Sequence, residues 1–243
     1  MSDADLYELL QALGLVRIAE ILKERLAFAQ QNKWTIKRIL KDLLTEERIY
    51  RQDRRLRGRI KRAHIPEQWT LETFPYDRQP GIDRQLINEL AELDFVKTGT
   101  NLVFIALTGR GKSGLASSLL LKALLNGYTG MLQSTQEILD DLHRSIADRK
   151  TKYLLNKYST MDVLVADEIG YLNLNDDQVN LFFKLMDNRY QRGKSTIITT
   201  NLGYDDWSPH FRNSPMVEPL KSRIKQRCVT ITIDGPDLRS PAR

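Results

Sequence analysis

Apolar residues recur at spacings of three and four along the first quarter of the chain, which predicts helices. The segments LYELLQALGL and IAEILKERLAFAQ, within residues 6–30, follow this spacing. A third periodic segment runs from Thr35 to Ala63 with few helix-breaking residues, and Thr35 is suited to cap its start. We therefore expect residues 1–64 to form a small helical domain.

The pattern changes after residue 64. Residues 65–82 contain three prolines and little periodicity, so we predict a linker there. A helix is predicted over 83–93, and helix-like and strand-like segments alternate from residue 101 onward. The predicted strands span 101–107, 128–134, 162–168, 195–201 and 228–234, and the predicted helices between them span 112–126, 135–148, 151–158, 176–191 and 216–226.

This alternation is typical of an α/β domain, which we place at residues 83–243. The predicted strands are mainly apolar, as strands buried on both faces of a sheet are. Strands that alternate with helices pair in parallel and are covered by the helices. The sequence thus predicts a five-stranded parallel sheet between helices, joined to a small all-helical N-terminal domain.

Charge is distributed unevenly between these two parts. The chain of 243 residues has a formal net charge of +6, and residues 1–64 hold 15 Lys and Arg against 9 Asp and Glu. The remaining residues hold 22 of each kind, so the whole excess lies in the helical part. Such asymmetry favours a module that binds a polyanion attached to a neutral domain.

The excess is concentrated in residues 48–62, which contain eight basic residues and a single acid, Asp53. Steps of three, four, four and three residues place five arginines on one helical face. Ile49, Leu56 and Ile60 are expected on another face, docked on the preceding helices. An ordinary solvated surface is the alternative, but the imbalance favours contact with the phosphates of duplex DNA. The predicted DNA-binding residues are Arg48, Arg51, Arg54, Arg55, Arg59 and Arg62.

No apolar run approaches the ~20 residues that a membrane helix needs, and we expect no membrane partner. The first residues, MSDADLYELL, are acidic and lack the apolar segment of an export signal. Cys228 is the single cysteine, and we expect it to be a small apolar residue of the last strand. A lone cysteine fits a reducing cytoplasm.

A glycine-containing loop follows the strand predicted at 101–107 and precedes a helix. Backbone N–H groups of such a loop can wrap a phosphate, with Lys112 reaching the β- and γ-phosphates and Ser113 binding Mg²⁺. Ala106 stands where the pattern G-x-x-x-x-G-K-[ST] begins with glycine. A strand-to-helix turn that merely carries a lysine is the alternative. The predicted nucleotide-binding residues are Thr108, Gly109, Arg110, Gly111, Lys112, Ser113 and Gly114.

Two further strands end in polar residues. Asp167 and Glu168 follow the apolar residues of VLVADE, and Asn201 ends STIITTN. In an open parallel sheet the carboxyl ends of the strands face the ligand. We expect Asp167 to hold Mg²⁺ through water, Glu168 to polarise the attacking water and Asn201 to hold that water or the γ-phosphate. A helix cap and a turn residue are the alternatives for these positions.

Together these segments resemble AAA+ ATPases, and specifically the IstB-like family, which are ATP-dependent helpers of insertion-sequence transposition. DnaC-like bacterial helicase loaders are a related branch. The resemblance covers about residues 50–240 and is carried by 71–116 (LETFPYD to GRGKSGLA), 166–202 (ADEIGYLNLNDD to TIITTNL) and WSPHF. The sequence departs from the family at Ala106, where glycine is usual, and at Gly114, where histidine is common.

The resemblance also implies roles for two C-terminal arginines. Arg223 in LKSRIKQR matches the arginine finger that reaches the ATP of a neighbouring subunit, and Arg239 in GPDLR matches the second sensor, which touches the γ-phosphate in its own subunit. It further implies an ATP- and Mg²⁺-dependent homo-oligomer, a ring or spiral on duplex DNA, which remodels target DNA and recruits a partner transposase.

Three other functions compete with this interpretation. A helicase loader would use its N-terminal domain to hold a helicase, which the arginine-rich helix disfavours. A small-molecule kinase would need an acceptor pocket, and the Asp167–Glu168 pair with Asn201 fits hydrolysis better. A nucleotide-gated DNA clamp with negligible turnover is conceivable because of Ala106.

Overall fold

The computed structural model describes residues 3–66, 69–171, 174–212 and 214–239. The chain forms two compact units, Met1–Gly58 and Arg59–Arg243, and the boundary falls inside a helix rather than at residue 64. Each unit has its own apolar core, and we describe the two separately.

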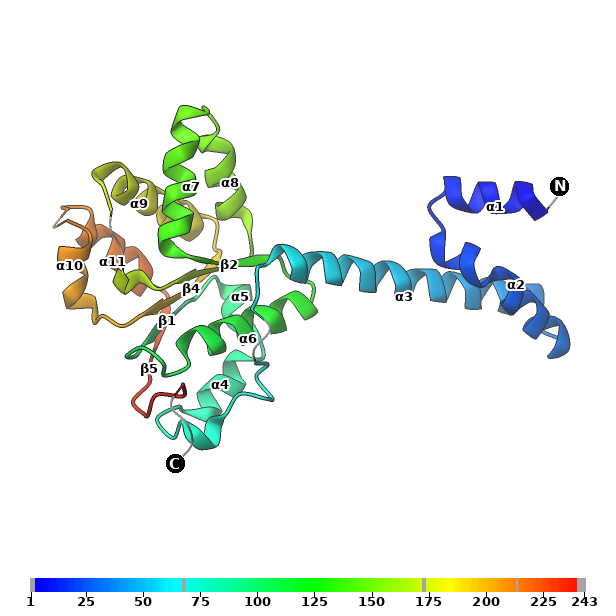
Figure 1. Ribbon diagram of the computed structural model, residues 1–243, viewed down its shortest axis with the longest axis horizontal. Coiled ribbons are helices and arrows are strands. Elements are labelled where there is room, and N and C mark those ends of the chain that lie inside the picture. Colours follow the sequence, from blue (N-terminus) through cyan, green and yellow to red (C-terminus); the bar gives the residue numbers. More distant parts are fainter. Residues whose placement is uncertain (1–2, 67–68, 172–173, 213, 240–243) are drawn as a thin grey trace. The chain divides into compact units, whose positions relative to one another are not determined.

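The first unit consists of α1 (Asp3–Ala12), α2 (Val16–Gln31) and most of α3, which spans Ile36–Arg62 (Figure 1). Its core cluster contains Ile18, Ile21, Leu22 and Leu43. This arrangement confirms the predicted N-terminal helices.

One buried acid ties α3 to the start of α2. Glu47 accepts a 3.0 Å hydrogen bond from the backbone N–H of Ile18 and a 2.8 Å bond from Nε of Arg51. Burial opposes ionisation of this carboxyl, but the two donors outweigh it and hold the pKa of Glu47 below its usual value. Arg51 also donates to the carbonyl of Gly14 at 3.0 Å.

The predicted docking of Ile49 and Ile60 on the preceding helices is wrong. Ile49 is 53% exposed, and Ile60 packs against the core of the second unit. Helical spacing identified residues that share a face, but it does not determine what that face contacts.

The second unit is built on a five-stranded sheet in the order β2-β3-β4-β1-β5, in which every pair is parallel. This confirms the predicted α/β class. The strands are β1 (Asn101–Ile105), β2 (Gly130–Ser134), β3 (Val163–Asp167), β4 (Ser195–Thr200) and β5 (Cys228–Thr232). The helices are α4 (Arg84–Leu90), α5 (Asp94–Thr98), α6 (Lys112–Leu125), α7 (Thr135–Ala147), α8 (Thr151–Thr160), α9 (Asp176–Gln191), α10 (Trp207–His210) and α11 (Val217–Lys225).

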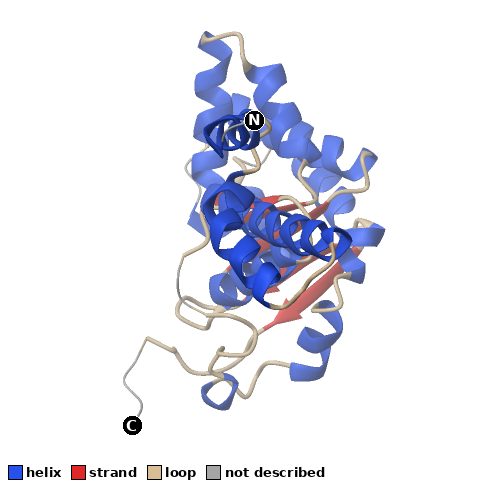
Figure 2. Ribbon diagram, turned by 90° about the vertical axis from the view of Figure 1, so that its right-hand side faces the viewer, coloured by secondary structure: helices blue, strands red, loops and turns tan. Residues whose placement is uncertain are grey.

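Helices cover both faces of this sheet (Figure 2). Alternate residues of a strand point to opposite faces, so Leu102 and Phe104 of β1 join one core with α4, α5 and α6, whereas Val103 joins the other with α7, α8, α9 and α11. The helix predicted over 83–93 ends earlier, because Leu93 adopts a left-handed φ of 64° and α5 begins after it.

The segment predicted as a linker belongs to the second unit. Phe74 and Ile82 are buried in its core, and Gln79 is also buried. Nε2 of Gln79 donates to the carbonyls of Arg110 and Pro236, each at 3.1 Å. The segment packs through irregular turns, which leave no periodic signal in the sequence.

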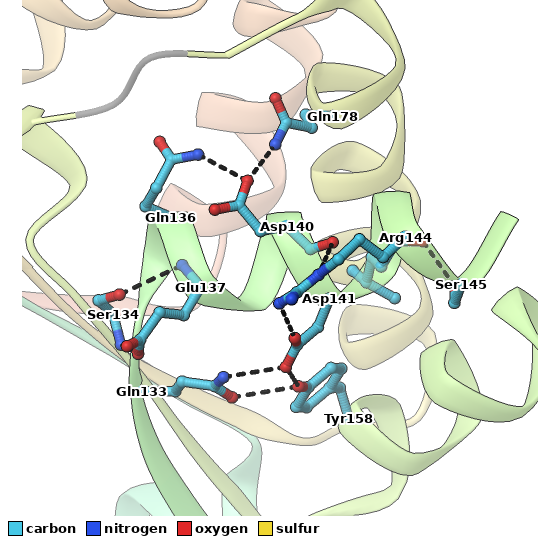
Figure 3. Close-up of polar contacts among 11 residues, drawn as sticks. Gln133, Ser134, Gln136, Glu137, Asp140, Asp141, Arg144, Ser145, Tyr158 and Gln178 are labelled. Carbon is cyan, nitrogen blue, oxygen red and sulfur yellow. Dashed lines mark hydrogen bonds and ion pairs between the residues drawn. The ribbon is translucent and has the colours of Figure 1, made fainter. Parts of the chain in front are cut away.

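A polar network holds α7 against its neighbours (Figure 3). Asp141 accepts hydrogen bonds from Nε2 of Gln133 at 3.1 Å and from the hydroxyl of Tyr158 at 3.2 Å. Asp140 accepts a 2.6 Å bond from Gln178 of α9. Burial beside Asp141 raises the pKa of Tyr158, so its hydroxyl stays a donor. Within the described ranges, no helix is both long and apolar enough to span a bilayer.

Candidate nucleotide-binding site

The loop between β1 and α6 has the backbone geometry of a phosphate cradle. Gly109 and Gly111 adopt left-handed φ values of 81° and 91°, which glycine reaches without steric cost, and Gly111 caps α6. The N–H groups at the start of α6 are the kind of donors that hold phosphate oxygens.

Ala106 does not disturb this loop. Its φ is not in the left-handed region, and its N–H donates to Thr200 O at 3.1 Å, as a continuing strand residue does. The glycine that is usual here is therefore not required by the backbone conformation of this chain.

The Lys112 ammonium lies over the loop. Nζ donates to the carbonyls of Ala106 and Leu107, at 2.7 and 2.9 Å. Burial lowers the pKa of Lys112, and the charges of Asp167 and Glu168 oppose that shift. This ammonium is half-buried and bonded only to neutral carbonyls, so a nearby phosphate oxygen would stabilise it through a charge-assisted hydrogen bond.

A hydroxyl and a carboxylate meet beside this lysine. Ser113 Oγ donates to Oδ1 of Asp167 at 2.8 Å, and Thr199 donates to the same oxygen. Glu168, with a left-handed φ of 61°, donates its N–H to Oγ1 of Thr199 at 3.0 Å. Mg²⁺ in nucleotide sites is held by one or two such oxygen ligands together with phosphates and water, so this donor set fits it.

Lys112, Ser113 and Glu168 line a cavity of about 340 Å³ at the carboxyl ends of the strands. The sequence predicted nine of its lining residues. They are Thr108, Gly109, Gly111, Lys112, Ser113, Gly114, Glu168, Asn201 and Arg239.

Asn201 is held close to residue 170. A Cβ added to Gly170 would lie 1.6 Å from Oδ1 of Asn201. That oxygen is buried and makes no hydrogen bond within the described part of the chain. A bound water or hydroxyl would donate a hydrogen bond to such an unpaired acceptor.

Three of the residues predicted for the nucleotide site are not among those that line the cavity. They are Asp167, which Ser113 contacts, Arg110, and Arg223, which was expected to reach the ATP of a neighbouring subunit. The Arg110 guanidinium donates to Ile233 O at 3.2 Å and pairs with Asp234 at 3.1 Å, so only its backbone belongs to the cradle. Arg223 lies on α11 outside the cavity, and its Nε donates to Asp187 of α9 at 3.1 Å.

The sequence interpretation missed Trp69, which lines the cavity. A Cβ on Gly114 would approach Cε3 of Trp69 at 2.4 Å, so glycine is what allows the indole to lie over the first turn of α6. The carbonyl of Trp69 accepts a 2.9 Å bond from Ser118. Trp69 lies in the segment predicted as a linker, where no periodic pattern indicated that a side chain would reach the site.

It also missed the contact of the C-terminal segment with the loop. Leu238 lines the cavity and donates its N–H to Gly109 O at 2.9 Å. A Cβ on Gly109 would lie 2.0 Å from the Asp237 carboxylate, which in turn accepts the N–H of Arg239 at 2.8 Å. This segment brings Arg239 to the cavity.

The predicted DNA-binding arginines all lie on α3, and two of them already have internal partners. Arg51 is held by Glu47 and Gly14, and Nη1 of Arg59 donates to Gly127 O at 2.9 Å. The other four are exposed, with no hydrogen bond or ion pair to any residue that the structure describes. They are Arg48, Arg54, Arg55 and Arg62.

The chain is similar to a known protein family over almost its whole length. The chain matches the family model described as IstB-like ATP binding protein over residues 8–243. It is 31% identical over 235 residues to the Insertion sequence IS21 putative ATP-binding protein of Pseudomonas aeruginosa, which covers 97% of this chain and 88% of that protein.

Solved structures resemble the second unit's fold. A crystal structure of the DnaC helicase loader superposes with a TM-score of 0.55 at 25% identity, covering 62% of this chain and 88% of that one. The replication initiator DnaA bound to AMPPCP and single-stranded DNA gives 0.58 at 18% identity, covering 70% and 52%. With its AAA+ fold, its phosphate cradle and a family match over almost its whole length, this chain belongs to the IstB-like ATP-binding proteins of insertion sequences.

Proposed function

We propose that this protein hydrolyses ATP in subunits that assemble on duplex DNA, and that the assembly remodels target DNA and recruits or stimulates a transposase. The observation that carries the proposal is the convergence of Lys112, Ser113, Asp167 and Glu168 at the end of the sheet. This set supplies a phosphate ligand and a base in one cavity, and metal ligands at Ser113 and at the Asp167 carboxylate that Ser113 contacts.

Each side chain has a distinct task in hydrolysis. Lys112 holds the β- and γ-phosphates, and Ser113 with Asp167 would hold Mg²⁺, which neutralises charge on those phosphates. Glu168 accepts a proton from water as the water oxygen bonds to the γ-phosphorus. The bond from that phosphorus to the β–γ bridging oxygen then breaks, and ADP and phosphate result. Asn201 offers its unpartnered oxygen to the same water.

We assign the two C-terminal arginines to different subunits. Arg239 lines the cavity and neutralises the γ-phosphate of its own subunit. Arg223 lies outside it, where Asp187 and the Tyr190 ring, 5.1 Å from the guanidinium carbon, hold the side chain partly exposed. An arginine held in this way on the surface suits a neighbouring subunit's ATP, and the proposal therefore requires oligomers.

The DNA-binding role rests on α3. The four exposed arginines without described partners provide cations to contact phosphates without first breaking a bond. The names of the relatives place them in insertion sequences, which supports a transposase as partner. The likeness to a helicase loader keeps loading of a replicative helicase as the second candidate.

The test is steady-state ATP hydrolysis by the full chain with and without duplex DNA. We expect turnover that requires Mg²⁺ and changes when duplex is added, together with a nucleotide-dependent increase in mass on the duplex. If ATP is not hydrolysed under any condition, the better explanation is a DNA clamp that nucleotide binding opens or closes without hydrolysis. Normal turnover without any response to duplex, and co-purification with a hexameric helicase, would favour the loader.

A further inference from the structure

The first unit has a small core for its size. Its buried apolar cluster comprises Ile18, Ile21, Leu22 and Leu43, with partly buried side chains around it. A unit of fewer than 60 residues buries little apolar surface, and its stability is correspondingly marginal. Large apolar side chains nevertheless remain on the surface of all three of its helices, and those of α1 and α3 share their surfaces with charged side chains.

The first surface is on α3 and we call it the α3 face. It consists of Ile36, Lys37, Leu40, Lys41 and Leu44, which follow one another at helical spacing and are all exposed. Its three apolar members are between 55% and 78% exposed. Apolar and cationic side chains therefore share this face.

The acids in the same half of α3 turn away from the α3 face. Asp42 and Glu46 both pair with Arg25 of α2, at 3.6 and 3.4 Å, and Glu47 is buried. The positive charge of Lys37 and Lys41 is therefore not balanced by these carboxylates.

The second surface is on α1 and the residue that follows it, and we call it the α1 face. It consists of Asp5, Glu8, Leu9, Ala12 and Leu13, which are exposed and also lie at helical spacing. The two leucines are 50% and 69% exposed, and α1 contains no Lys or Arg. Apolar and anionic side chains share this face.

We propose that the α1 face of one copy of this protein binds the α3 face of the next. Exposed apolar groups of this size are costly unless covered, and the two faces carry opposite charge at matching density. Because the two faces differ, the contact is head-to-tail, and repeated contacts generate a ring or an open filament. This interface goes beyond the proposed function, since it requires neither nucleotide nor DNA.

Duplex DNA is the other candidate for the α3 face, because the arginines of α3 continue the same helical face. DNA phosphates cannot bury the apolar side chains of Ile36, Leu40 and Leu44, whereas an apolar protein surface can. The experiment below separates the two.

The test is sedimentation velocity of the full chain, 28.1 kDa per subunit, over a range of concentrations without nucleotide or DNA. One variant carries Lys37→Glu and Lys41→Glu, and a second carries Asp5→Lys and Glu8→Lys. We expect wild type to self-associate and each variant to do so at least tenfold more weakly. An equimolar mixture of the two variants should recover association, because each then offers the other oppositely charged faces.

A matched control carries Lys23→Glu and Lys184→Glu, the same change in charge at exposed positions on α2 and α9, and should sediment as wild type. The proposal is overturned if wild type stays a single chain, if each variant sediments as wild type, or if the mixture recovers nothing. Unchanged sedimentation with weaker duplex binding by the Lys37→Glu/Lys41→Glu variant assigns the α3 face to DNA instead.

Discussion

The hydroxyl of Ser113, in the first turn of α6, donates a 2.8 Å hydrogen bond to Oδ1 of Asp167 at the end of β3. This bond joins two motifs that lie 54 residues apart in the chain. It holds two hard oxygen ligands beside Lys112, ready for a divalent cation. The following predictions depend on this geometry and on the contacts around it.

Ser113→Ala should retain part of its ATP affinity but lose most of the gain that Mg²⁺ gives. The substitution removes a metal ligand and leaves the backbone N–H groups and Lys112 in place. Titration of a fluorescent ATP analogue with and without Mg²⁺ measures both quantities. Ser222→Ala, on the exposed side of α11, is the control, and an undiminished Mg²⁺ response in Ser113→Ala would remove Ser113 from the metal site.

Lys112→Ala and Glu168→Gln should separate binding from turnover. Losing the ammonium should weaken ATP binding on the order of 100-fold, because a charged partner of the phosphates is gone. Glu168→Gln should bind ATP normally and hydrolyse it ~10²–10⁴ times more slowly, since the amide cannot accept the proton. Equilibrium binding and phosphate release report the two effects. Normal turnover by the Glu168→Gln protein excludes Glu168 as the base.

Gly114→Ala should destabilise the protein by about 1–3 kcal/mol, although glycine-to-alanine changes inside helices normally stabilise. The new Cβ would meet Cε3 of Trp69 at 2.4 Å. In a Trp69→Ala background the same change should be neutral or stabilising, because the obstacle is absent. Chemical denaturation of the four proteins measures this coupling, and equal effects in both backgrounds would contradict the packing of Trp69 on Gly114.

Arg223→Ala should bind nucleotide yet hydrolyse it ~10³–10⁵ times more slowly, if it acts on a neighbour's phosphates. Mixing it with Glu168→Gln subunits should restore part of the turnover. The Glu168→Gln subunit supplies Arg223 to a neighbour that retains its own base. Turnover measured across mixing ratios tests this, and a complete failure to recover would assign Arg223 a role within its own subunit.

Replacing Arg48, Arg55 and Arg62 together with Ala should weaken duplex binding at all sequences and flatten its log–log salt dependence by about two to three units. These three are preferable to Arg51 and Arg59, whose internal hydrogen bonds would confuse loss of DNA contact with loss of structure. Fluorescence anisotropy at several salt concentrations gives the slope, with ATP binding expected to be unchanged.

Arg57→Ala is the control for that variant, because Arg57 is exposed on the same helix but paired with Asp53 at 2.6 Å. An unchanged salt slope in the triple variant would make a protein partner the better explanation of the arginine-rich helix.

The sequence by itself determined the parallel sheet and most of the cavity. Buried strands, capped helices and the loop from Gly109 to Ser113 depend on residues close together in the chain, so the spacing of residue types along the sequence predicts them. Asp167 and Asn201 were found because strands that run parallel bring their carboxyl ends to one edge. The family resemblance added Arg239, which local chemistry did not identify.

Only the tertiary structure decided which irregular segments complete the site. Trp69, Gln79 and Leu238 reach the loop through turns that have no period, and their contacts join residues up to 160 positions apart. The structure also showed that Ile49 is left exposed and that the Arg110 side chain turns away. Spacing along a chain fixes which side chains share a face. What covers that face depends on the packing of distant segments.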